Sequence, residues 1–431
     1  MNAHLEFGTD GIRGRAGDFP ITPATAWVIG RVVGALGRVL LAADPRESSP
    51  WLVAAVAAGV RAAGGGAEYV GVLPTPALSE LLAAGWGDCG VMVTASHNPA
   101  ADNGLKVLGP DGRKLSDEPQ AALEAALNLE LARGRAPAVL PTAEPAPRSA
   151  DSRERYLTAL RARLPAGAWL TGHRIAVDGA FGAGGPTAVA LLASLGAEVV
   201  PMGCEPDGAR INAACGALYP EALAARVLEV EASAGIALDG DADRGVLVMR
   251  DGRILDGDAL LFLLARPPAA VGTIMSGAGL EEGLRARGIA LIRTPVGDRF
   301  VDAAVHAQGL VAGAEPSGHV CLAGGLPTAD GTLTCLTALA AGLDLQARLA
   351  GYAPWPRALL KVPVRRRLPL GHPEIAAACA AAEADLGPGG RVLLRYSGTE
   401  PLLRVLTEGR DPVAVQRTAE VLARRTRALL E

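Results

Sequence analysis

Residues 38–74 read "RVLLAADPRESSPWLVAAVAAGVRAAGGGAEYVGVLP", and this stretch decides the fold. The apolar run at 38–45 predicts a strand, the Ala- and Val-rich stretch at 50–64 predicts a helix, and 67–74 predicts a second strand. Glycine closes the helix before the next strand begins. A strand, a helix and a strand in this order are typical of a βαβ unit in a parallel sheet.

The same alternation continues along the chain and returns twice. A helix at 76–85 and a strand at 89–95 complete the first unit. A second unit begins at 173 and leads to "GIALDGDADRGVLV" (235–248), and a third begins at 271 and leads to "GLVAGAEPSGH" (309–319). We therefore predict three related α/β domains with mixed, largely parallel sheets.

Two shifts in composition mark further boundaries. The Pro- and Ala-rich stretch 134–150 predicts a linker, and "YAPWPRALLKVPVRRR" (352–367) precedes a different pattern. There a short strand and an Ala-rich helix lead to "RVLLRYSGTEPLLRVLTEG" (391–409), which predicts a hairpin in a smaller C-terminal α+β domain. We expect domains at 1–148, 149–250, 251–358 and 359–431.

Composition limits the classes of partner and compartment. The net charge is −4 and the pI is about 6.0, so no general basic surface is available for nucleic acid. Six scattered cysteines without a C-x-x-C pair are typical of a reducing cytosol. The start resembles no signal peptide, and the apolar runs are too short to span a bilayer. We expect a cytoplasmic protein without nucleic-acid or membrane partners; a homodimer is one assembly that the sequence leaves open.

The stretch "VTASHNP" (93–99) places Ser96 after a predicted strand, at the edge where α/β sheets usually bind ligands. A hydrolase nucleophile would lie in G-x-S-x-G, whereas Ser96 is flanked by Ala95 and His97. Neighbours on an extended chain point to opposite sides, so His97 should be badly placed as the base for Ser96. By itself the motif fits either a catalytic serine or a polar loop.

The stretch "LDGDADRG" (238–245) carries alternating aspartates at Asp239, Asp241 and Asp243. Three carboxylates that converge repel one another unless a hard cation such as Mg²⁺ neutralises them. The alternative is a solvated loop, but the apolar stretches on both sides favour a positioned metal site. Arg244 follows directly and adds a cation that could meet a phosphate.

The predicted hairpin loop offers donors for a phosphate. Arg395, Ser397, Thr399 and Arg404, together with the backbone amides around Gly398, are the groups that a phosphate clamp requires. A β-turn with ordinary surface arginines is the alternative.

Other polar groups suit a sugar phosphate. Glu315 and Ser317 in "GAEPSGH" could bind sugar hydroxyls, while His319 could be structural. Arg13 lies in the glycine-rich "FGTDGIRG" (7–14) and Lys106 in "DNGLK" (102–106), where either could stabilise charge or move protons.

Together these motifs resemble the α-D-phosphohexomutase superfamily, in the family's order and over nearly the whole chain. The series is "FGTDGIRG", "TASHNP", "DNGLK", "DGDADR", "TPVGDRF", "GAEPSGH" and "SGTEPLLRV". Within the superfamily, "GCEPDG" (203–208) and "TPVGDR" (294–299) resemble phosphoglucosamine mutases more than phosphomannomutases.

The resemblance implies a phosphorylated Ser96 and one Mg²⁺ per chain, held by that phosphate with Asp239, Asp241 and Asp243. It also implies four domains around a central cleft, with the loop at 397–401 closing over the substrate. The implied partner is a hexosamine phosphate, and the implied reaction interconverts glucosamine 6-phosphate and glucosamine 1-phosphate for cell-wall precursors. Glucosamine 1,6-bisphosphate or glucose 1,6-bisphosphate would be the intermediate or activator.

For the chemistry, we expect Lys106 to be the general acid or base, because a nearby dication can lower a lysine pKa. His97 is the alternative, and Arg13 and Arg244 would neutralise charge. A phosphomannomutase/phosphoglucomutase remains an alternative function. A Mg²⁺-dependent phosphatase with Asp239 as nucleophile and a non-catalytic sugar-phosphate sensor are further alternatives.

The chain departs from the family pattern at three places. Pro316 stands where "GEQSGH" is usual, Ala217-Leu218-Tyr219 replaces polar residues of "CGSTHPE", and Ala100 and Ala101 follow the serine motif. These departures affect the choice of sugar more than the choice of reaction.

Overall fold

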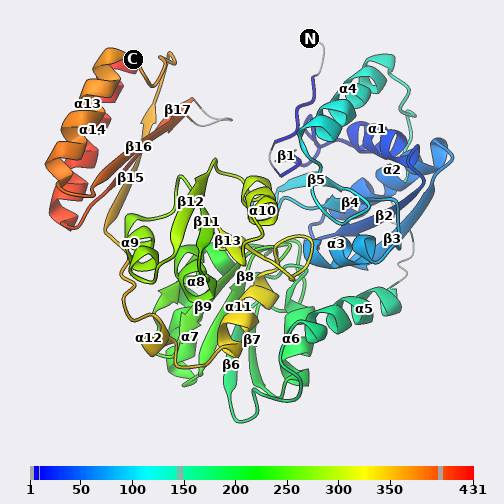
Figure 1. The fold of residues 1–431 in the computed structure, drawn as a ribbon. Helices are drawn as coiled ribbons and strands as arrows, with labels where there is room; N and C mark the ends of the chain where they lie inside the picture. Colours follow the sequence, from blue (N-terminus) through cyan, green and yellow to red (C-terminus); the bar gives the residue numbers. More distant parts are fainter. Residues whose placement is uncertain (1–3, 9, 143–144, 146–148, 397–400) are drawn as a thin grey trace. The chain divides into compact units, whose positions relative to one another are not determined.

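The computed structural model describes residues 4–8, 10–142, 145, 149–396 and 401–431, and the chain divides into two compact units. The larger unit consists of residues 1–275 and 291–349. The smaller consists of residues 276–290 and 350–431. Figure 1 gives the helices and strands of both.

The first sheet of the larger unit confirms the predicted βαβ unit. Its strand order is β1-β5-β4-β2-β3, with β2 parallel to both β3 and β4 and with β5 antiparallel to β4 and β1. Its strands are β1 (Ile12–Arg15), β2 (Arg38–Ala43), β3 (Gly66–Val72), β4 (Cys89–Val93) and β5 (Asp102–Leu108). Its helices are α1 (Pro23–Gly34), α2 (Ser49–Ala62), α3 (Thr75–Ala83) and α4 (Asp117–Arg133).

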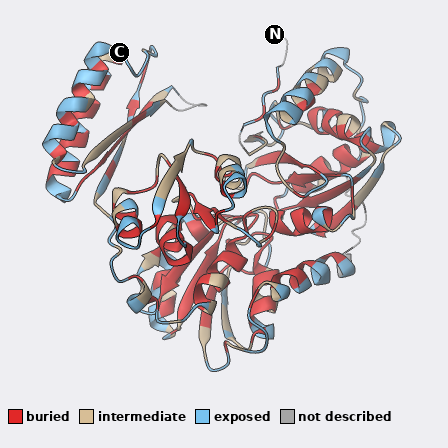
Figure 2. Ribbon diagram, in the orientation of Figure 1, coloured by how far each residue is buried: buried red, intermediate tan, exposed pale blue. Residues whose placement is uncertain are grey.

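Glycine lets α1 and α2 approach closely over this sheet. A Cβ at Gly30 would lie 2.0 Å from the Val56 carbonyl oxygen, and one at Gly59 would lie 2.0 Å from the Trp27 carbonyl oxygen. The sequence has few aromatic residues, so the core is built by bringing helix backbones together over small side chains. The buried strands and inner helix faces stand out in Figure 2.

The second sheet repeats this plan. Its order is β10-β9-β8-β6-β7, with β6 parallel to β7 and β8 and with β9 antiparallel to β8 and β10. Its strands are β6 (Arg174–Asp178), β7 (Glu198–Met202), β8 (Ala234–Leu238), β9 (Gly245–Met249) and β10 (Ile254–Leu255). Its helices are α5 (Ser149–Ala162), α6 (Gly185–Ser194) and α7 (Glu221–Glu229), with a 3₁₀ turn at Gly216–Leu218.

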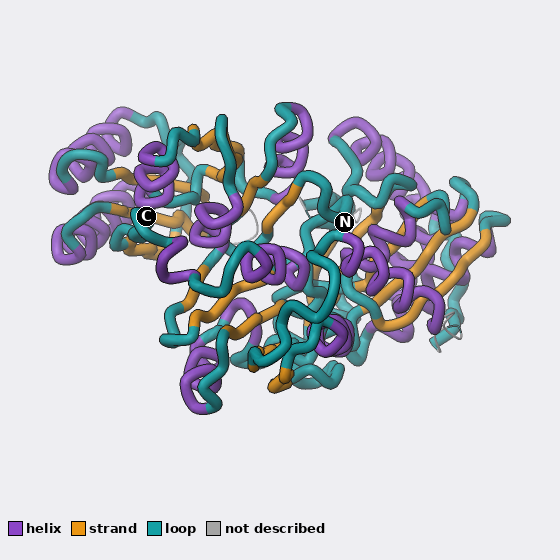
Figure 3. Tube along the Cα trace, turned by 60° about the horizontal axis from the view of Figure 1, so that its bottom comes forward, coloured by secondary structure: helices purple, strands orange, loops and turns teal. Residues whose placement is uncertain are grey.

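The third sheet has the order β12-β11-β13-β14, with β11 parallel to β13 and β14 antiparallel to β13. Its strands are β11 (Ala269–Thr273), β12 (Ala290–Thr294), β13 (Ala312–Ala314) and β14 (Val320–Leu322). Its helices are α8 (Gly257–Leu264), α10 (Asp298–Ala307), α11 (Gly331–Ala340) and α12 (Leu345–Arg348). The tube in Figure 3 follows the alternation of helix and strand. The three mixed sheets confirm the expected architecture.

The smaller unit has one antiparallel sheet of order β15-β17-β16, as the predicted hairpin requires. Its elements are α9 (Ala278–Ala286), β15 (Arg357–Pro363), α13 (Pro373–Leu386), β16 (Arg391–Tyr396), β17 (Leu402–Glu408) and α14 (Pro412–Leu430). Val362, Leu403 and Val405 pack against Ile375 and Leu422 of the two long helices. This confirms a smaller α+β domain, while the four exact domain limits and the central cleft stay predictions.

No helix in the described part of the chain is both long enough and apolar enough to cross a membrane.

Candidate active site

Ser96 lies three residues beyond the end of β4 and is fully buried. Its φ of 51° is in the left-handed region, which a residue other than glycine adopts only when its surroundings hold it there. Its amide donates to Thr94 Oγ1 at 2.8 Å, and its Oγ donates to Asp239 Oδ2 at 2.7 Å. The structure thus joins the serine motif to the aspartate motif, which is 143 residues away in the sequence.

The expectation that His97 points away from Ser96 is wrong. His97 Nδ1 lies 3.3 Å from Ser96 Oγ. The backbone is not extended at Ser96, so the rule for alternating side chains does not apply there. Burial lowers the pKa of His97 to about 3, and the positive charges of Arg244 and Arg13 act in the same direction. The imidazole is therefore neutral at ordinary pH and able to accept a hydrogen bond.

The three alternating aspartates converge, as the sequence predicts. One oxygen from each of Asp239, Asp241 and Asp243 lies within 4.8 Å of the others, and all three residues are buried. Burial raises the pKa of Asp239 to about 7, with the charges of Asp243 and Asp241 adding to the effect. Burial also favours protonation of Asp243, but His319 and Lys106 outweigh it and hold its pKa below the ordinary range.

These aspartates fit a divalent cation. Asp241 Oδ1 and Asp243 Oδ1 are buried and have no hydrogen-bond partner among the described residues. An unsatisfied buried carboxylate oxygen is costly unless a positive charge meets it. Oxygen ligands of this kind suit Mg²⁺. The arrangement supports the predicted Mg²⁺ site.

Lys106 lies on β5 and is 2% exposed. Its Nζ is 2.8 Å from Asp241 Oδ2, 2.9 Å from Asp243 Oδ2 and 3.2 Å from Asp10 Oδ2. Burial lowers the pKa of Lys106, but the carboxylates of Asp241 and Asp243 outweigh it and leave the pKa above its ordinary value. This direction holds for the site without a cation, and the lowering expected from a bound dication stays a prediction.

Two arginines reach the same centre. Arg244 Nε is 3.8 Å from Asp239 Oδ2, and the Arg244 backbone amide donates to Asp239 Oδ1 at 3.3 Å. Arg13 on β1 pairs with Asp10 and donates to Asn98 Oδ1 at 3.4 Å. The structure therefore brings both predicted cations to the serine and aspartate motifs.

The segment 315–319 makes hydrogen bonds to backbone amides of other segments, including the end of the loop that carries Asp239, Asp241 and Asp243. Glu315 is buried and its Oε1 accepts from the Gly297 amide at 2.8 Å, while Ser317 is half-buried. Gly318 O accepts from the Gly245 amide at 3.0 Å. Pro316 is a departure from the family pattern, and its carbonyl oxygen accepts a hydrogen bond from the Gly257 amide at 3.2 Å. The bond from Gly245 connects the proposed sugar-binding segment with the end of the loop that carries the aspartates, while the other two connect it with the starts of α10 and α8.

Two further departures from the family pattern are Ala217-Leu218-Tyr219 and Ala100-Ala101. Ala217 is buried, whereas Leu218 and Tyr219 are 42% and 50% exposed. Ala101 O accepts from the Ala16 amide at 3.0 Å.

The predicted phosphate clamp belongs to the smaller unit. Arg395 on β16 lies directly opposite Arg404 on β17, and both are exposed. Directly opposed residues share one face of a sheet, where like charges are unfavourable unless an anion offsets them. Ser397, Gly398 and Thr399 lie outside the described residues.

Sequence reasoning missed several charged residues beside the site. Lys114 pairs with Asp10 and lies 2.5 Å from Asp298 Oδ2, which is also 3.0 Å from His319 Nε2. His319 Nδ1 lies 3.7 Å from Asp243 Oδ1, which completes a series of alternating charges. Only the three-dimensional approach of five segments creates this series of charges.

Sequence reasoning also missed the groups that hold the serine loop. Arg46 donates to the carbonyl oxygen of Ser96 at 2.9 Å, and Asn212 Nδ2 donates to the same oxygen at 2.8 Å. The polar run that follows β2 could have indicated Arg46, because the strand ends of α/β sheets carry ligand sites.

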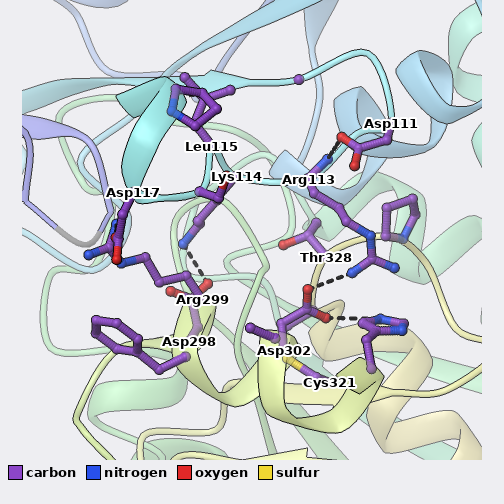
Figure 4. Close-up of a pocket in the computed structure, with 18 of the residues that line it drawn as sticks. Asp111, Arg113, Lys114, Leu115, Asp117, Asp298, Arg299, Asp302, Cys321 and Thr328 are labelled. Carbon is purple, nitrogen blue, oxygen red and sulfur yellow. Dashed lines mark hydrogen bonds and ion pairs between the residues drawn. The ribbon is translucent and has the colours of Figure 1, made fainter. Parts of the chain in front are cut away.

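A cavity of about 600 Å³ lies beside the site rather than in it. Figure 4 shows ion pairs along its wall between the segment 111–117 and α10, including Arg113 with Asp302 at 2.5 Å and Lys114 with Asp298. Neither Ser96 nor the three aspartates line it. The serine and the three aspartates therefore lie outside the wall of this cavity.

Comparisons with known proteins agree with this geometry. Four family models match the chain, described as phosphoglucomutase/phosphomannomutase alpha/beta/alpha domain I (residues 4–133), alpha/beta/alpha domain II (154–252), alpha/beta/alpha domain III (256–351) and C-terminal domain (359–425). A phosphoglucosamine mutase of Gluconacetobacter diazotrophicus is 42% identical over 96% of this chain and 95% of its own. One of Alkalilimnicola ehrlichii is 41% identical over 97% and 96%.

Solved structures show the same fold. A phosphoglucomutase/phosphomannomutase family protein from Burkholderia thailandensis is 25% identical, with a TM-score of 0.74 and 97% of both chains covered. An Aspergillus fumigatus N-acetylphosphoglucosamine mutase, solved with GlcNAc-6P and magnesium, is 18% identical with a TM-score of 0.68, covering 99% of this chain and 96% of its own. The chain therefore belongs to the phosphohexomutase family, in which it resembles phosphoglucosamine mutases over nearly its whole length.

Proposed function

We propose that this protein interconverts glucosamine 6-phosphate and glucosamine 1-phosphate through a phosphoserine at Ser96 and a bisphosphorylated sugar. The observation that carries the proposal is the hydrogen bond from Ser96 Oγ to Asp239, within a buried cluster of three aspartates. The relatives named above support glucosamine phosphates as the substrate class.

In the first half-reaction the bond from phosphorus to Ser96 Oγ breaks, and a bond from phosphorus to the free sugar hydroxyl oxygen forms. The hydroxyl proton leaves to a base, and Ser96 Oγ gains a proton. Lys106, held in its charged form by Asp241 and Asp243, suits proton donation. His97 is the alternative to Lys106 in this proton transfer. Its imidazole is neutral, lies 3.3 Å from Ser96 Oγ and would act as the proton acceptor.

Asp239, Asp241 and Asp243, with the phosphate on Ser96, would hold one Mg²⁺, which neutralises charge on the transferred group when bound. Arg244 and Arg13 add fixed positive charge around the same oxygens. Positioning and charge neutralisation are the main contributions that phosphoryl transfer asks of a protein.

The bisphosphate, glucosamine 1,6-bisphosphate or its glucose counterpart, then turns and returns its other phosphate to Ser96. Glu315 and Ser317 would bind hydroxyls in both orientations. Arg395 and Arg404, with Ser397, Gly398 and Thr399, would hold the phosphate that is not reacting. The exposure and direct opposition of the two arginines support this role.

The test is an isomerase assay with a trace of the bisphosphate. We expect turnover of glucosamine phosphates, loss of turnover in Ser96→Ala, and a phosphate mapped to Ser96 by mass spectrometry. Faster turnover of mannose or glucose phosphates would identify a phosphomannomutase/phosphoglucomutase instead. Release of inorganic phosphate without isomer would identify a phosphatase.

The reaction belongs in the cytoplasm, where cell-wall precursors are made. All six cysteines are free thiols, which supports a reducing compartment. Size-exclusion chromatography with light scattering would distinguish the monomer from the homodimer.

A further inference from the structure

Arg46 is a fully buried arginine in the loop between β2 and α2, and it is among the largest fully buried side chains of the protein. Its guanidinium uses all five N–H donors. Nε donates to Asp44 Oδ2 at 2.9 Å. The other four bonds go to backbone carbonyl oxygens of the turn that follows Ser96: Ser96 at 2.9 Å, Asn98 at 2.8 Å, Asp102 at 2.9 Å, and Pro99.

Asn212 binds the same turn from the other side. Its Nδ2 donates to Ser96 O at 2.8 Å and to Asn98 O at 3.1 Å. Asn212 comes from the loops of the second sheet, whereas Arg46 comes from the first. The carbonyl oxygens of Ser96 and Asn98 therefore each accept hydrogen bonds from loop residues of two different sheets.

The charge of Arg46 is paired with Asp44 and not with any of the three aspartates of the proposed metal site. Asp44 is buried and neutralises it, and Thr94 Oγ1 donates to the same carboxylate at 2.7 Å. Thr94 also accepts from the Ser96 amide at 2.8 Å, so the carboxylate, the threonine and Arg46 fix both backbone ends of Ser96. A guanidinium committed to five acceptors has no donor left for a phosphate.

We propose that Arg46, with Asn212, is a positioning residue that holds Ser96 in its left-handed conformation, so that Oγ faces Asp239 whether or not it carries a phosphate. This inference rests on the proposed phosphoserine mechanism. The serine must receive and donate the phosphoryl group from one position in every cycle, and a displacement of about 1 Å can cost roughly 100-fold in rate.

Lysine cannot replace Arg46, because three donors on one nitrogen cannot reach five acceptors in a planar fork. In Arg46→Lys we expect kcat to fall by roughly 100-fold. KM for the sugar phosphate should change little, because the donors of Arg46 bind Asp44 and the turn after Ser96. The fraction of chains phosphorylated at Ser96 should also fall.

A matched control is Arg348→Lys. Arg348 also donates to several backbone carbonyls, those of Ala338, Gly342 and Leu263, far from the serine turn. The same substitution there should leave kcat and phosphorylation unchanged. Equal effects of the two variants would overturn the proposal.

Asn212→Gly keeps the proposal testable if Arg46→Lys does not fold. Asn212 has a φ of 59°, which glycine adopts freely, so the substitution removes the amide donors without backbone strain. We expect a lower kcat with an unchanged KM, and an unchanged kcat would overturn the proposal. Absence of isomerisation in the wild-type protein would instead count against the proposed function itself.

Discussion

Gly240 lies against the Ser96 carbonyl oxygen, in the middle of the aspartate motif. A Cβ at this position would lie 2.6 Å from Ser96 O, 2.9 Å from Ile211 Cδ1 and 3.0 Å from Asn212 Nδ2. The backbone oxygen cannot move without disturbing the bonds that hold the serine turn. Glycine is therefore required here by the close approach of two loops.

Gly240→Ala should reduce both stability and activity. We expect the free energy of unfolding to fall by about 1–3 kcal/mol, the usual cost of overpacking, and isomerisation to fall further because Ser96 is displaced. Denaturant unfolding and the coupled isomerase assay measure the two effects. Gly371→Ala is the control, since a Cβ there meets nothing within 4 Å. A fully active Gly240→Ala would refute the required close approach.

The ionisation of His97 gives a pH prediction for stability. Burial and the charges of Arg244 and Arg13 lower the pKa of His97 to about 3, against about 6.5 in an unfolded chain. Between these values the unfolded state binds a proton that the folded state does not, so this group lowers the free energy of unfolding as the pH falls.

The measurement compares wild type with His97→Asn in EDTA at pH 7 and pH 5. The wild type should lose more stability than the variant over this interval, because only the wild type carries the titrating imidazole. Identical losses in both proteins would mean that His97 does not titrate this way.

At the scale of single residues, the sequence was sufficient to predict those whose role follows from the neighbouring residues in the chain. Ser96 and the three aspartates were predicted from strand ends and alternating carboxylates, and the structure brings them together. Arg46 was not predicted, because its role depends on four carbonyl oxygens that only the folded turn presents. The position of His97 was mispredicted because a left-handed φ at Ser96 could not be inferred from the motif.

At the scale of elements, the N-terminus of α3 binds one of the three aspartates of the proposed metal site. Thr75 Oγ1 donates to Asp241 Oδ2 at 2.5 Å, and the Thr75 amide donates to Asp241 O at 3.0 Å. A helix terminus of the first sheet thus orients a carboxylate of the second. Groups that orient metal ligands in this way are usually worth 10–100-fold in metal affinity.

Thr75→Val keeps the shape of the side chain and removes the hydroxyl donor. We expect the Mg²⁺ concentration for half-maximal activity to rise roughly 10- to 100-fold, and isothermal titration calorimetry should show the same weakening. Thr337→Val is the control, because Thr337 Oγ1 donates to the Leu333 carbonyl of its own helix at 2.7 Å and not to a carboxylate. Equal Mg²⁺ affinity in the two variants would exclude this role for α3.

The order of elements was largely predictable, because hydrophobic periodicity and glycine-closed helices are local signals. The pairing direction was less so. β5 runs antiparallel to β4, and this direction carries Lys106 back toward the aspartates. The direction in which two strands pair depends on the path of the loop that connects them. The composition of residues 96–102 does not indicate that path.

At the scale of the whole molecule, the chain does not follow a simple succession of domains. Residues 276–290, which contain α9, cluster with residues 350–431 rather than with the sheet that flanks them in sequence. The sequence gives little warning, because α9 continues the strand and helix alternation of the third sheet. Contacts distant in sequence decide its place.

Glu408 supplies a buried contact between α9 and the C-terminal sheet, far apart in the sequence. It is fully buried, its carboxylate is 2.9 Å from Arg357 Nε and 2.5 Å from Arg391 Nε, and it accepts from the Ala278 amide at 3.0 Å. Arg391 also donates to Ser276 O at 2.6 Å. One carboxylate therefore joins β15, β16 and β17 to the start of α9.

Glu408→Gln should weaken this attachment. We expect a loss of roughly 3 kcal/mol in the stability of the smaller unit, the lower end of the cost of breaking a buried ion pair, because Arg357 and Arg391 are 28% and 22% exposed. Hydrogen exchange should accelerate in residues 276–290 and in the C-terminal sheet, while β2 and β4 keep their protection.

Glu282→Gln is the control for this prediction. Glu282 also pairs with an arginine of the smaller unit, Arg410 at 2.7 Å, but both side chains are solvent-exposed. An exposed pair contributes little, so this variant should leave exchange unchanged. If both variants behaved alike, burial of Glu408 would not be what binds α9 to the C-terminal sheet. Acceleration confined to Glu408→Gln would show that residues 276–290 fold with the C-terminal part of the chain through this carboxylate.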